Sequence, residues 1–258
     1  MADGDPTALR SVGIAVAILD CFADAPELGP TAVAQRLGIA KSTASRMLAV
    51  LAQGGILERR EGGRYRLGLR LFEYGQLALS RLRLAEVSVP VLADLRDRLR
   101  ELVQLGVAIG GEVLFLDRHE VESVDRRFHG PTWRRVPLHS SSCGRAIAAF
   151  NPAVAQAMLD RPLTRLTRYT LVDGGRLRAV LAETRRRGYA LTHEEAEEGM
   201  SSVAAPILVE RGGRRLAIAG VSVVGPSRRF SEARARSIAT HVRAAAAEIA
   251  AVVEVRAG

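Results

Sequence analysis

Residues 30–53 constrain the fold most, because they form two short helical patterns joined by Leu37-Gly38-Ile39. The second pattern has an apolar stripe with the spacing of one helix face, at Ala44, Met47, Leu48 and Leu51. Its opposite stripe is small, polar and basic, at Ser42, Ser45, Arg46 and Ala49. Gly38 supplies the left-handed conformation that a tight turn after a helix requires. The pattern predicts a helix-turn-helix, whose second helix enters the major groove of DNA.

A basic hairpin is predicted directly after this motif. Gly54-Gly55 ends the second helix, and two short apolar and basic strands, 56–60 and 64–67, flank Glu61-Gly62-Gly63. Eight lysine or arginine residues but only two glutamates lie between residues 29 and 70, in a chain of net charge +9. Concentrated positive charge of this kind attracts phosphate. A helical hairpin alone favours DNA only modestly, but the added wing predicts a winged helix-turn-helix.

The DNA-contacting residues are predicted from these two elements. Thr31 is also the expected N-cap of the first helix of the motif. Arg46 is expected to contact a base or a phosphate, and the wing arginines to contact phosphates. The full predicted set is Thr31, Lys41, Ser42, Thr43, Ser45, Arg46, Arg60, Arg64, Tyr65 and Arg66.

Composition excludes several other classes of protein. Cys21 and Cys143 are the only cysteines, so a disulfide framework is excluded and a cytoplasmic setting is expected. The first six residues are acidic and polar, unlike a signal peptide, and no apolar run approaches membrane-spanning length. Neither a cofactor nor a metal is expected. The histidines lack metal-ligand spacing and are predicted to lie at the surface, at positions 119, 129, 139 and 193.

The rest of the 258 residues predicts a second, α+β domain. An amphipathic helix over about 71–84 is interpreted as a linker that pairs with its copy in a partner chain, or else as a packing helix. Beyond it, helices are predicted at 90–100, 146–150, 152–160 and 177–187, with strands at 103–109, 113–116, 203–209 and 216–224. Ser231 is predicted to cap a long last helix.

Several ordered segments resemble the IclR family of bacterial transcriptional regulators. The first, within residues 38–75, reads GIAKSTASRMLAVLAQGGILERREGGRYRLGLRLFEYG. The later ones read PLHSSSCGRAIAAF, RRRGYALTHEEAEEGMSSVAAPI and GVSVVGPSRRFS. Because they occur in the family's order along nearly the whole chain, together they are far more specific than any one alone.

The resemblance implies a DNA-binding regulator, with repression favoured over activation, that acts as a homodimer or homotetramer on a double-stranded operator. It implies a winged helix-turn-helix at residues 8–68, a linker helix at 69–85, and a GAF-like antiparallel-sheet effector domain at 86–258. It also implies a small-molecule effector site at Ser142, Cys143, Thr192, Ser202 and Ser222.

The residues at this implied site allow a prediction about the effector. Ser140–Ser142 precede a helix whose first N–H groups are unpaired, which suits an anion. Leu138, Met200 and Val224 are expected to cover the rest of a ligand. Because Thr192 and Val224 stand where related proteins carry more polar residues, a partly apolar carboxylic acid or an aromatic compound is favoured over a small dicarboxylate.

Two alternatives from other classes remain open at this point. Cys143 near a helix N-terminus would suit a thiol-dependent enzyme, and the second domain alone would suit a nucleotide sensor. No histidine and aspartate are arranged around Cys143 by the sequence, so no catalytic residue is assigned and the chain is expected not to be an enzyme. The glutamates at 194, 195, 197 and 198 are interpreted as a solvated acidic face.

Overall fold

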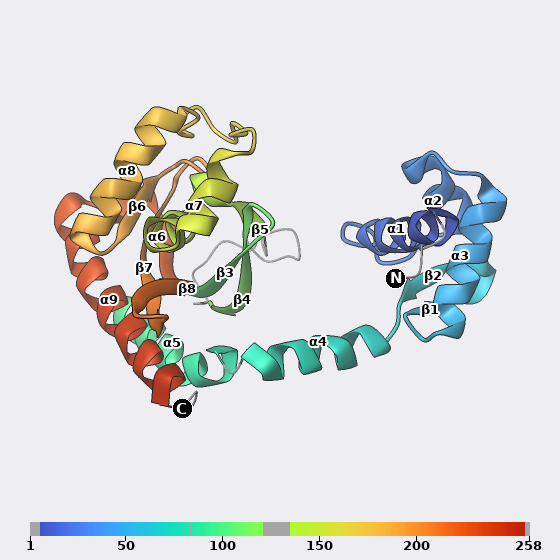
Figure 1. The fold of residues 1–258 in the computed structure, drawn as a ribbon, viewed down its shortest axis with the longest axis horizontal. Helices are drawn as coiled ribbons and strands as arrows, with labels where there is room; N and C mark the ends of the chain where they lie inside the picture. Colours follow the sequence, from blue (N-terminus) through green and yellow to red (C-terminus); the bar gives the residue numbers. More distant parts are fainter. Residues whose placement is uncertain (1–5, 83, 121–134, 256–258) are drawn as a thin grey trace. The chain divides into compact units, whose positions relative to one another are not determined.

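The structure, a computed structural model, describes residues 6–82, 84–120 and 135–255. Its packing divides the chain into two compact units after Leu82, and each unit is described by itself. The N-terminal unit contains α1 (Pro6–Asp20), α2 (Pro30–Leu37), α3 (Lys41–Gln53), β1 (Leu57–Arg59), β2 (Tyr65–Leu67) and α4 (Arg70–Leu82) (Figure 1).

The helix-turn-helix is confirmed in the N-terminal unit. Gly38 ends α2 with φ 62° and ψ 33°, and its N–H donates to the carbonyl of Ala34. Ala44 and Leu48 of α3 are fully buried against α1 and α2. The polar stripe of α3 is exposed, as the periodicity predicts for a helix that packs on one side only.

Two details of this unit differ from the sequence prediction. Gly29, and not Thr31, is the N-cap of α2, because Pro30 takes the first helical position, where its fixed φ and missing N–H cost nothing. Tyr65 is only 5% exposed and packs in the core, while its backbone N–H and carbonyl pair with Leu28. The Tyr65 side chain is therefore not free to contact DNA.

The C-terminal unit is built on a six-stranded antiparallel sheet in the order β5-β4-β3-β8-β7-β6, counted over the residues that the structure describes. The strands are β3 (Leu102–Ile109), β4 (Glu112–His119), β5 (Arg135–Pro137), β6 (Ala190–His193), β7 (Met200–Arg211) and β8 (Arg214–Pro226). The helices are α5 (Leu84–Leu99), α6 (Ser142–Phe150), α7 (Pro152–Leu159), α8 (Gly174–Arg187) and α9 (Glu232–Val255).

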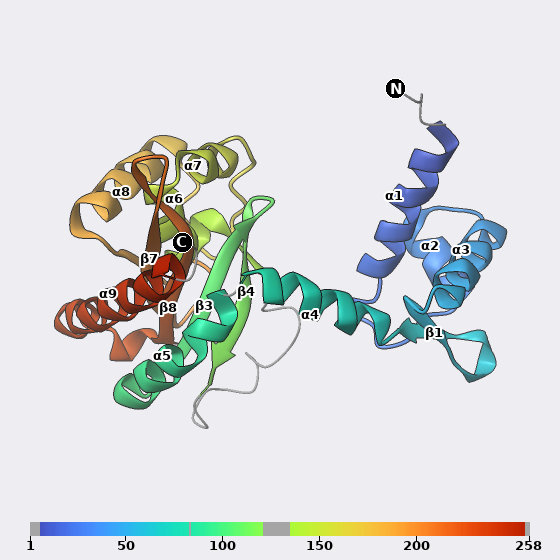
Figure 2. The same ribbon diagram turned by 60° about the horizontal axis from the view of Figure 1, so that its bottom comes forward.

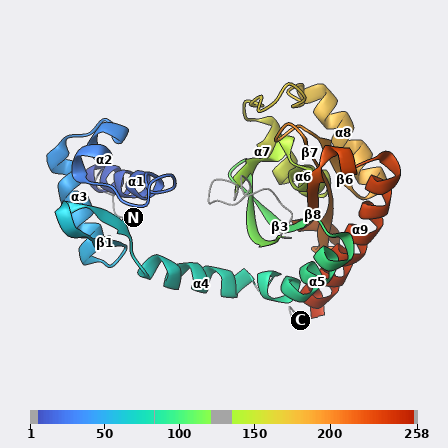
Figure 3. The same ribbon diagram turned by 180° about the vertical axis from the view of Figure 1, so that it is seen from behind.

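Helices cover both faces of this sheet (Figures 2 and 3). On one face α5 and α9 pack through Leu92, Ile238 and other apolar residues against β3, β7 and β8. On the other face α6 and α8 pack through Ile147 and Leu177. The unit is thus the predicted α+β domain. The segment 137–150, which carries part of the family resemblance, includes α6.

The helix boundaries show where local signals succeed and fail. Ser231 caps α9 as predicted, because its Oγ accepts a hydrogen bond from the Arg234 N–H at 3.3 Å. The start of α5 was predicted at Pro90, yet the helix begins at Leu84 and continues through the proline. Leu84 and Val87 are buried, so the extra turns add to the apolar face that packs on the sheet.

Candidate functional site

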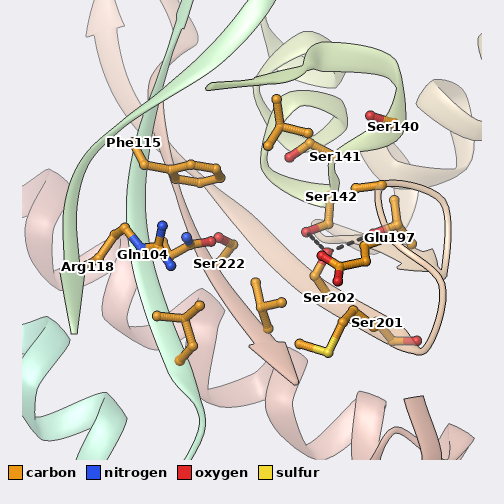
Figure 4. A pocket seen from close by; sticks show the side chains of 16 residues that line it. Gln104, Phe115, Arg118, Ser140, Ser141, Ser142, Glu197, Ser201, Ser202 and Ser222 are labelled. Atoms are coloured by element: carbon orange, nitrogen blue, oxygen red, sulfur yellow. Dashed lines mark hydrogen bonds between the residues drawn. The ribbon is translucent and has the colours of Figure 1, made fainter. Parts of the chain in front are cut away.

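A cavity opens on the α6 face of the sheet in the C-terminal unit (Figure 4). Its volume, including the open mouth, is about 600 Å³. It is lined from β3, β4, β5, β6, β7, β8, the loop before β7 and the N-terminal end of α6. The lining residues are Leu102, Gln104, Phe115, Arg118, Val136, Ser140, Ser141, Ser142, Thr192, Ala196, Glu197, Met200, Ser201, Ser202, Ser222 and Val224.

A chain of hydroxyl groups forms one wall of this cavity (Figure 4). Thr192 and Ser202 are register partners on β6 and β7, and their hydroxyl oxygens lie 2.7 Å apart. The Ser202 hydroxyl in turn donates to Ser142 Oγ at 2.7 Å. Ser141 caps α6 by accepting a hydrogen bond from the Gly144 N–H, so the start of the helix is fixed at the cavity wall. The structure thus brings three of the predicted effector residues into direct contact.

The opposite wall carries a second set of polar side chains (Figure 4). Gln104 on β3 and Ser222 on β8 are register partners, and both are buried. Arg118 on β4 adds a guanidinium that pairs with Glu120 at 3.3 Å. Ser222 Oγ has no hydrogen-bond partner among the described residues, although the side chain is only 1% exposed. A buried hydroxyl without a partner requires an explanation, and a bound ligand or water supplies one.

Apolar side chains complete the cavity. Phe115, Met200 and Val224 line it, so two of the three predicted apolar neighbours are present. Leu138, the third, is 1% exposed and packs in the core beneath α6 instead. One cavity therefore presents polar groups on two walls and apolar surface between them, as ligand sites for small organic molecules do.

Cys143 does not line this cavity, contrary to the sequence prediction. Its sulfur fits between Gly106 on β3 and Gly220 on β8, where an added Cβ at either glycine would come within 2.9 Å of it. Burial raises the pKa of the Cys143 thiol to about 12, and the thiol donates a hydrogen bond of 3.5 Å to the Gly220 carbonyl. A thiol that stays protonated and enclosed is a packing residue and not a nucleophile.

Sequence reasoning also missed or misplaced several other groups. Gln104, Phe115 and Arg118 were not predicted, although a single amide within the apolar strand at Gln104 is a usable signal. Two of the glutamates interpreted as solvated are not, because Glu195 forms an ion pair with buried Arg145 and Glu197 lines the cavity.

The histidines differ in exposure: His193 is exposed, as the sequence predicts, whereas His139 is buried. His139 is 4% exposed and its Nε2 lies 3.0 Å from the Thr164 carbonyl, so its predicted surface position is wrong. Burial lowers the pKa of His139. His129 lies outside the described residues. In the part of the chain that the structure describes, no three histidine, cysteine or acidic side chains gather as a metal site.

The N-terminal unit presents the second candidate surface. Lys41, Ser42, Ser45 and Arg46 are exposed on α3, with Thr43 half-buried beside them. In the wing, Arg66 donates to Glu58 at 2.7 Å, and Arg64 lies 3.5 Å from Glu27. Exposed ion pairs of this kind are weak, so the wing arginines can exchange a carboxylate for a phosphate.

An exposed helix-turn-helix joined in one chain to a cavity-bearing α+β unit defines a DNA-binding regulator with an effector domain. Comparison with known proteins agrees: residues 76–251 match the C-terminal domain of the bacterial transcriptional regulator IclR, and residues 11–61 match the IclR helix-turn-helix domain. The chain therefore belongs to the IclR family, whose members are DNA-binding regulators and not enzymes. Within the described residues, no helix has the length and apolar character needed to span a membrane.

Individual relatives match along almost their whole length. The HTH-type transcriptional regulator BhcR of Paracoccus denitrificans is 37% identical over 248 residues, covering 95% of this chain and 88% of the relative. The glycerol operon regulatory protein of Streptomyces griseus is 34% identical over 245 residues, covering 93% and 95%. A solved IclR homolog from Microbacterium hydrocarbonoxydans, complexed with 4-hydroxybenzoate, is 31% identical with a TM-score of 0.80, covering 96% of this chain and all of that one.

Proposed function

We propose that this regulator is a repressor that binds its operator as a homodimer or homotetramer and is controlled by a partly apolar carboxylic acid or an aromatic compound. The observation that carries the proposal is the cavity of the C-terminal unit. Its buried Ser222 hydroxyl has no partner among the described residues and shares the cavity with an apolar wall.

The polar wall at Gln104 and the apolar surface of the cavity suit the two ends of such a ligand. A carboxylate near Gln104, Arg118 and Ser222 would receive hydrogen bonds and positive charge. A ring or short apolar body would cover Phe115, Met200 and Val224, which a small dicarboxylate would leave in contact with water. The 4-hydroxybenzoate in the solved homolog supports an aromatic acid for this chain as well.

The operator contacts are proposed on α3 and the wing. Lys41 at the start of α3 and Arg46 in its second turn are exposed, and the serines beside them allow the helix to approach DNA closely. Thr31 of α2 adds to them, and buried Tyr65 does not, so the proposed contacts are Thr31, Lys41, Ser42, Thr43, Ser45, Arg46, Arg60, Arg64 and Arg66. The domain bounds at residues 8–68, 69–85 and 86–258 stay a prediction.

The proposed assembly uses the linker helix. Leu69, immediately before α4, is 81% exposed, and Phe72 within it is 65% exposed. Large apolar side chains that are this exposed favour association, and a second copy of the same helix would cover them. A homodimer would in turn require a pseudo-palindromic operator.

Calorimetry on the full chain tests the effector site. The ligands are 4-hydroxybenzoate, benzoate and succinate, and the aromatic acids should bind more tightly than the dicarboxylate. Ser222→Ala and Ser202→Ala should weaken the binding of the aromatic acids, whereas Ser237→Ala, an exposed serine on α9, is the matched control. If both cavity variants bind as tightly as the control, the ligand lies elsewhere and the site assignment fails.

A further inference from the structure

A second cavity lies in the C-terminal unit and shares no lining residue with the first. It is bounded by the segment 165–173, by α8 and by the edge strand β6, and its volume with its open mouth is about 1270 Å³. Five arginines line it, at Arg145, Arg165, Arg168, Arg176 and Arg187. The charge at this cavity depends on which of these arginines are already paired.

The carboxylates of this cavity are all engaged in the fold. Asp173 caps α8 by accepting a hydrogen bond from the Arg176 backbone N–H at 2.6 Å. Glu183 pairs with Arg186, whose side chain is not part of the lining. Glu195 is held by Arg145, with Nη1 and Oε1 2.7 Å apart. Asp173 keeps its negative charge, so the lining holds five arginines against three carboxylates, and two of those carboxylates are already paired with an arginine.

Three arginines at this cavity remain without a carboxylate partner among the described residues. Arg165 donates to backbone carbonyls, at 3.3 Å and 3.5 Å. Arg187 donates one N–H to the Tyr189 carbonyl at 2.6 Å. Arg176 is exposed on α8 and forms no ion pair in the described part of the chain. Since a guanidinium carries five N–H donors, each of these side chains keeps donors for an anion.

The wall that carries Arg165 is fixed in place. Thr167 Oγ1 donates to the Glu194 carbonyl at 2.7 Å, and Thr170 Oγ1 donates to the Glu195 carbonyl at 2.8 Å. The Leu171 N–H also donates to Glu195 Oε2 at 3.0 Å. A segment held by three hydrogen bonds loses little conformational freedom when a ligand binds, which favours affinity.

We propose that this second cavity is a binding site for a small, multiply charged oxyanion, distinct from the effector site. A phosphate monoester and a di- or tricarboxylate share the chemistry that several guanidinium groups lining one cavity recognise. Tyr169 and His193 offer a surface for the organic part of such a ligand. Their ring centroids lie 6.2 Å apart in an edge-on arrangement.

Calorimetry on the full chain tests this proposal with ribose 5-phosphate and citrate as probes and with acetate as the singly charged comparison. At least one probe should bind saturably and more tightly than acetate, and which one binds tells phosphate from carboxylate. Arg176→Ala and Arg165→Ala should each weaken that binding by about tenfold. Arg178→Ala removes an exposed arginine of the same helix that does not line the cavity and should have no effect.

The same titrations contain the results that would overturn the proposal. Absence of saturable binding up to about 10 mM of both probes would reject the site. An equal loss in Arg176→Ala and Arg178→Ala would mean a diffuse charge effect. Loss of binding in Ser222→Ala would place the probe in the first cavity, and a loss in Arg46→Ala alone would place it on the winged unit. Each of these last outcomes rejects the second site, while the first cavity remains the proposed effector site.

Discussion

The contact between Cys143 and Gly220 makes a quantitative prediction about how the sheet and α6 fit together. A Cβ added at Gly220 would lie 2.9 Å from the Cys143 sulfur, closer than real Cβ atoms come to a neighbour. Its next contacts, the carbonyl oxygens of Ala205 and Cys143, are both at an ordinary 3.5 Å. Gly220→Ala therefore creates one clash, and the atom that must move is the sulfur.

The cost follows from this single clash. Overpacking in a well-packed core typically destabilises by about 1–3 kcal/mol, so Gly220→Ala should lose that much. Cys143→Ala removes one buried heavy atom and should lose about 1 kcal/mol. In the double variant the new methyl group occupies the space that the sulfur leaves, so the total loss should fall below the sum of the two single losses by roughly 1–3 kcal/mol.

Urea unfolding followed by circular dichroism measures these losses as shifts of the unfolding midpoint. Because the two units can unfold separately, the transition to follow is the one that Gly220→Ala moves. Gly106→Ala is the matched control: its Cβ would also meet Val113 Cγ1 at 2.5 Å, so Cys143→Ala should rescue it only in part. Additive losses in the Gly220 and Cys143 pair would refute the packing role assigned to the sulfur.

Three further predictions concern Cys143, Arg46 and Phe72. At about pH 8, Cys143 in the folded protein should react with a thiol reagent far more slowly than in urea, because burial raises its pKa to about 12. Arg46→Ala should weaken operator binding by roughly 1–3 kcal/mol if it reads a base, or lower the salt slope by about 1 if it contacts a phosphate, and unchanged affinity in a salt titration would remove it from the interface. Sedimentation at micromolar concentration should show a dimer or tetramer that Phe72→Ser weakens, whereas a strict monomer with and without DNA would contradict the proposed assembly.

The helix-turn-helix was predictable because its signals are local. Ala44 and Leu48 stand four residues apart on one helix, and Gly38 sits where the chain must turn. Periodicity fixes such a face within a dozen residues, whatever the rest of the chain does. The same local reasoning failed at Thr31, where a good capping side chain competed with a proline one residue earlier and the proline decided the helix start.

The polar walls of the effector cavity depend instead on strand register. Gln104 and Ser222 lie side by side only because β3 pairs with β8, and these two strands are far apart in the sequence. Arg145 and Glu195, fifty residues apart, form their ion pair only once α6 lies on the sheet. From the sequence alone, a stretch of glutamates is therefore interpreted as a solvated face. Periodicity carries no information about which arginine each glutamate pairs with.

Ser142 and Cys143 show most directly what a sequence comparison leaves undecided. Both belong to one resembling segment and were assigned to one pocket, yet a single step along a helix turns the side chain by about 100°. Ser142 therefore joins the hydroxyl chain in the cavity, whereas Cys143 points into the core between two glycines. Gly106 and Gly220 are register partners on β3 and β8, and together they leave the space that this sulfur fills. The identity of residue 143 is thus tied to the packing of α6 on the sheet. A substitution of Cys143 should therefore change effector binding only by moving Ser142.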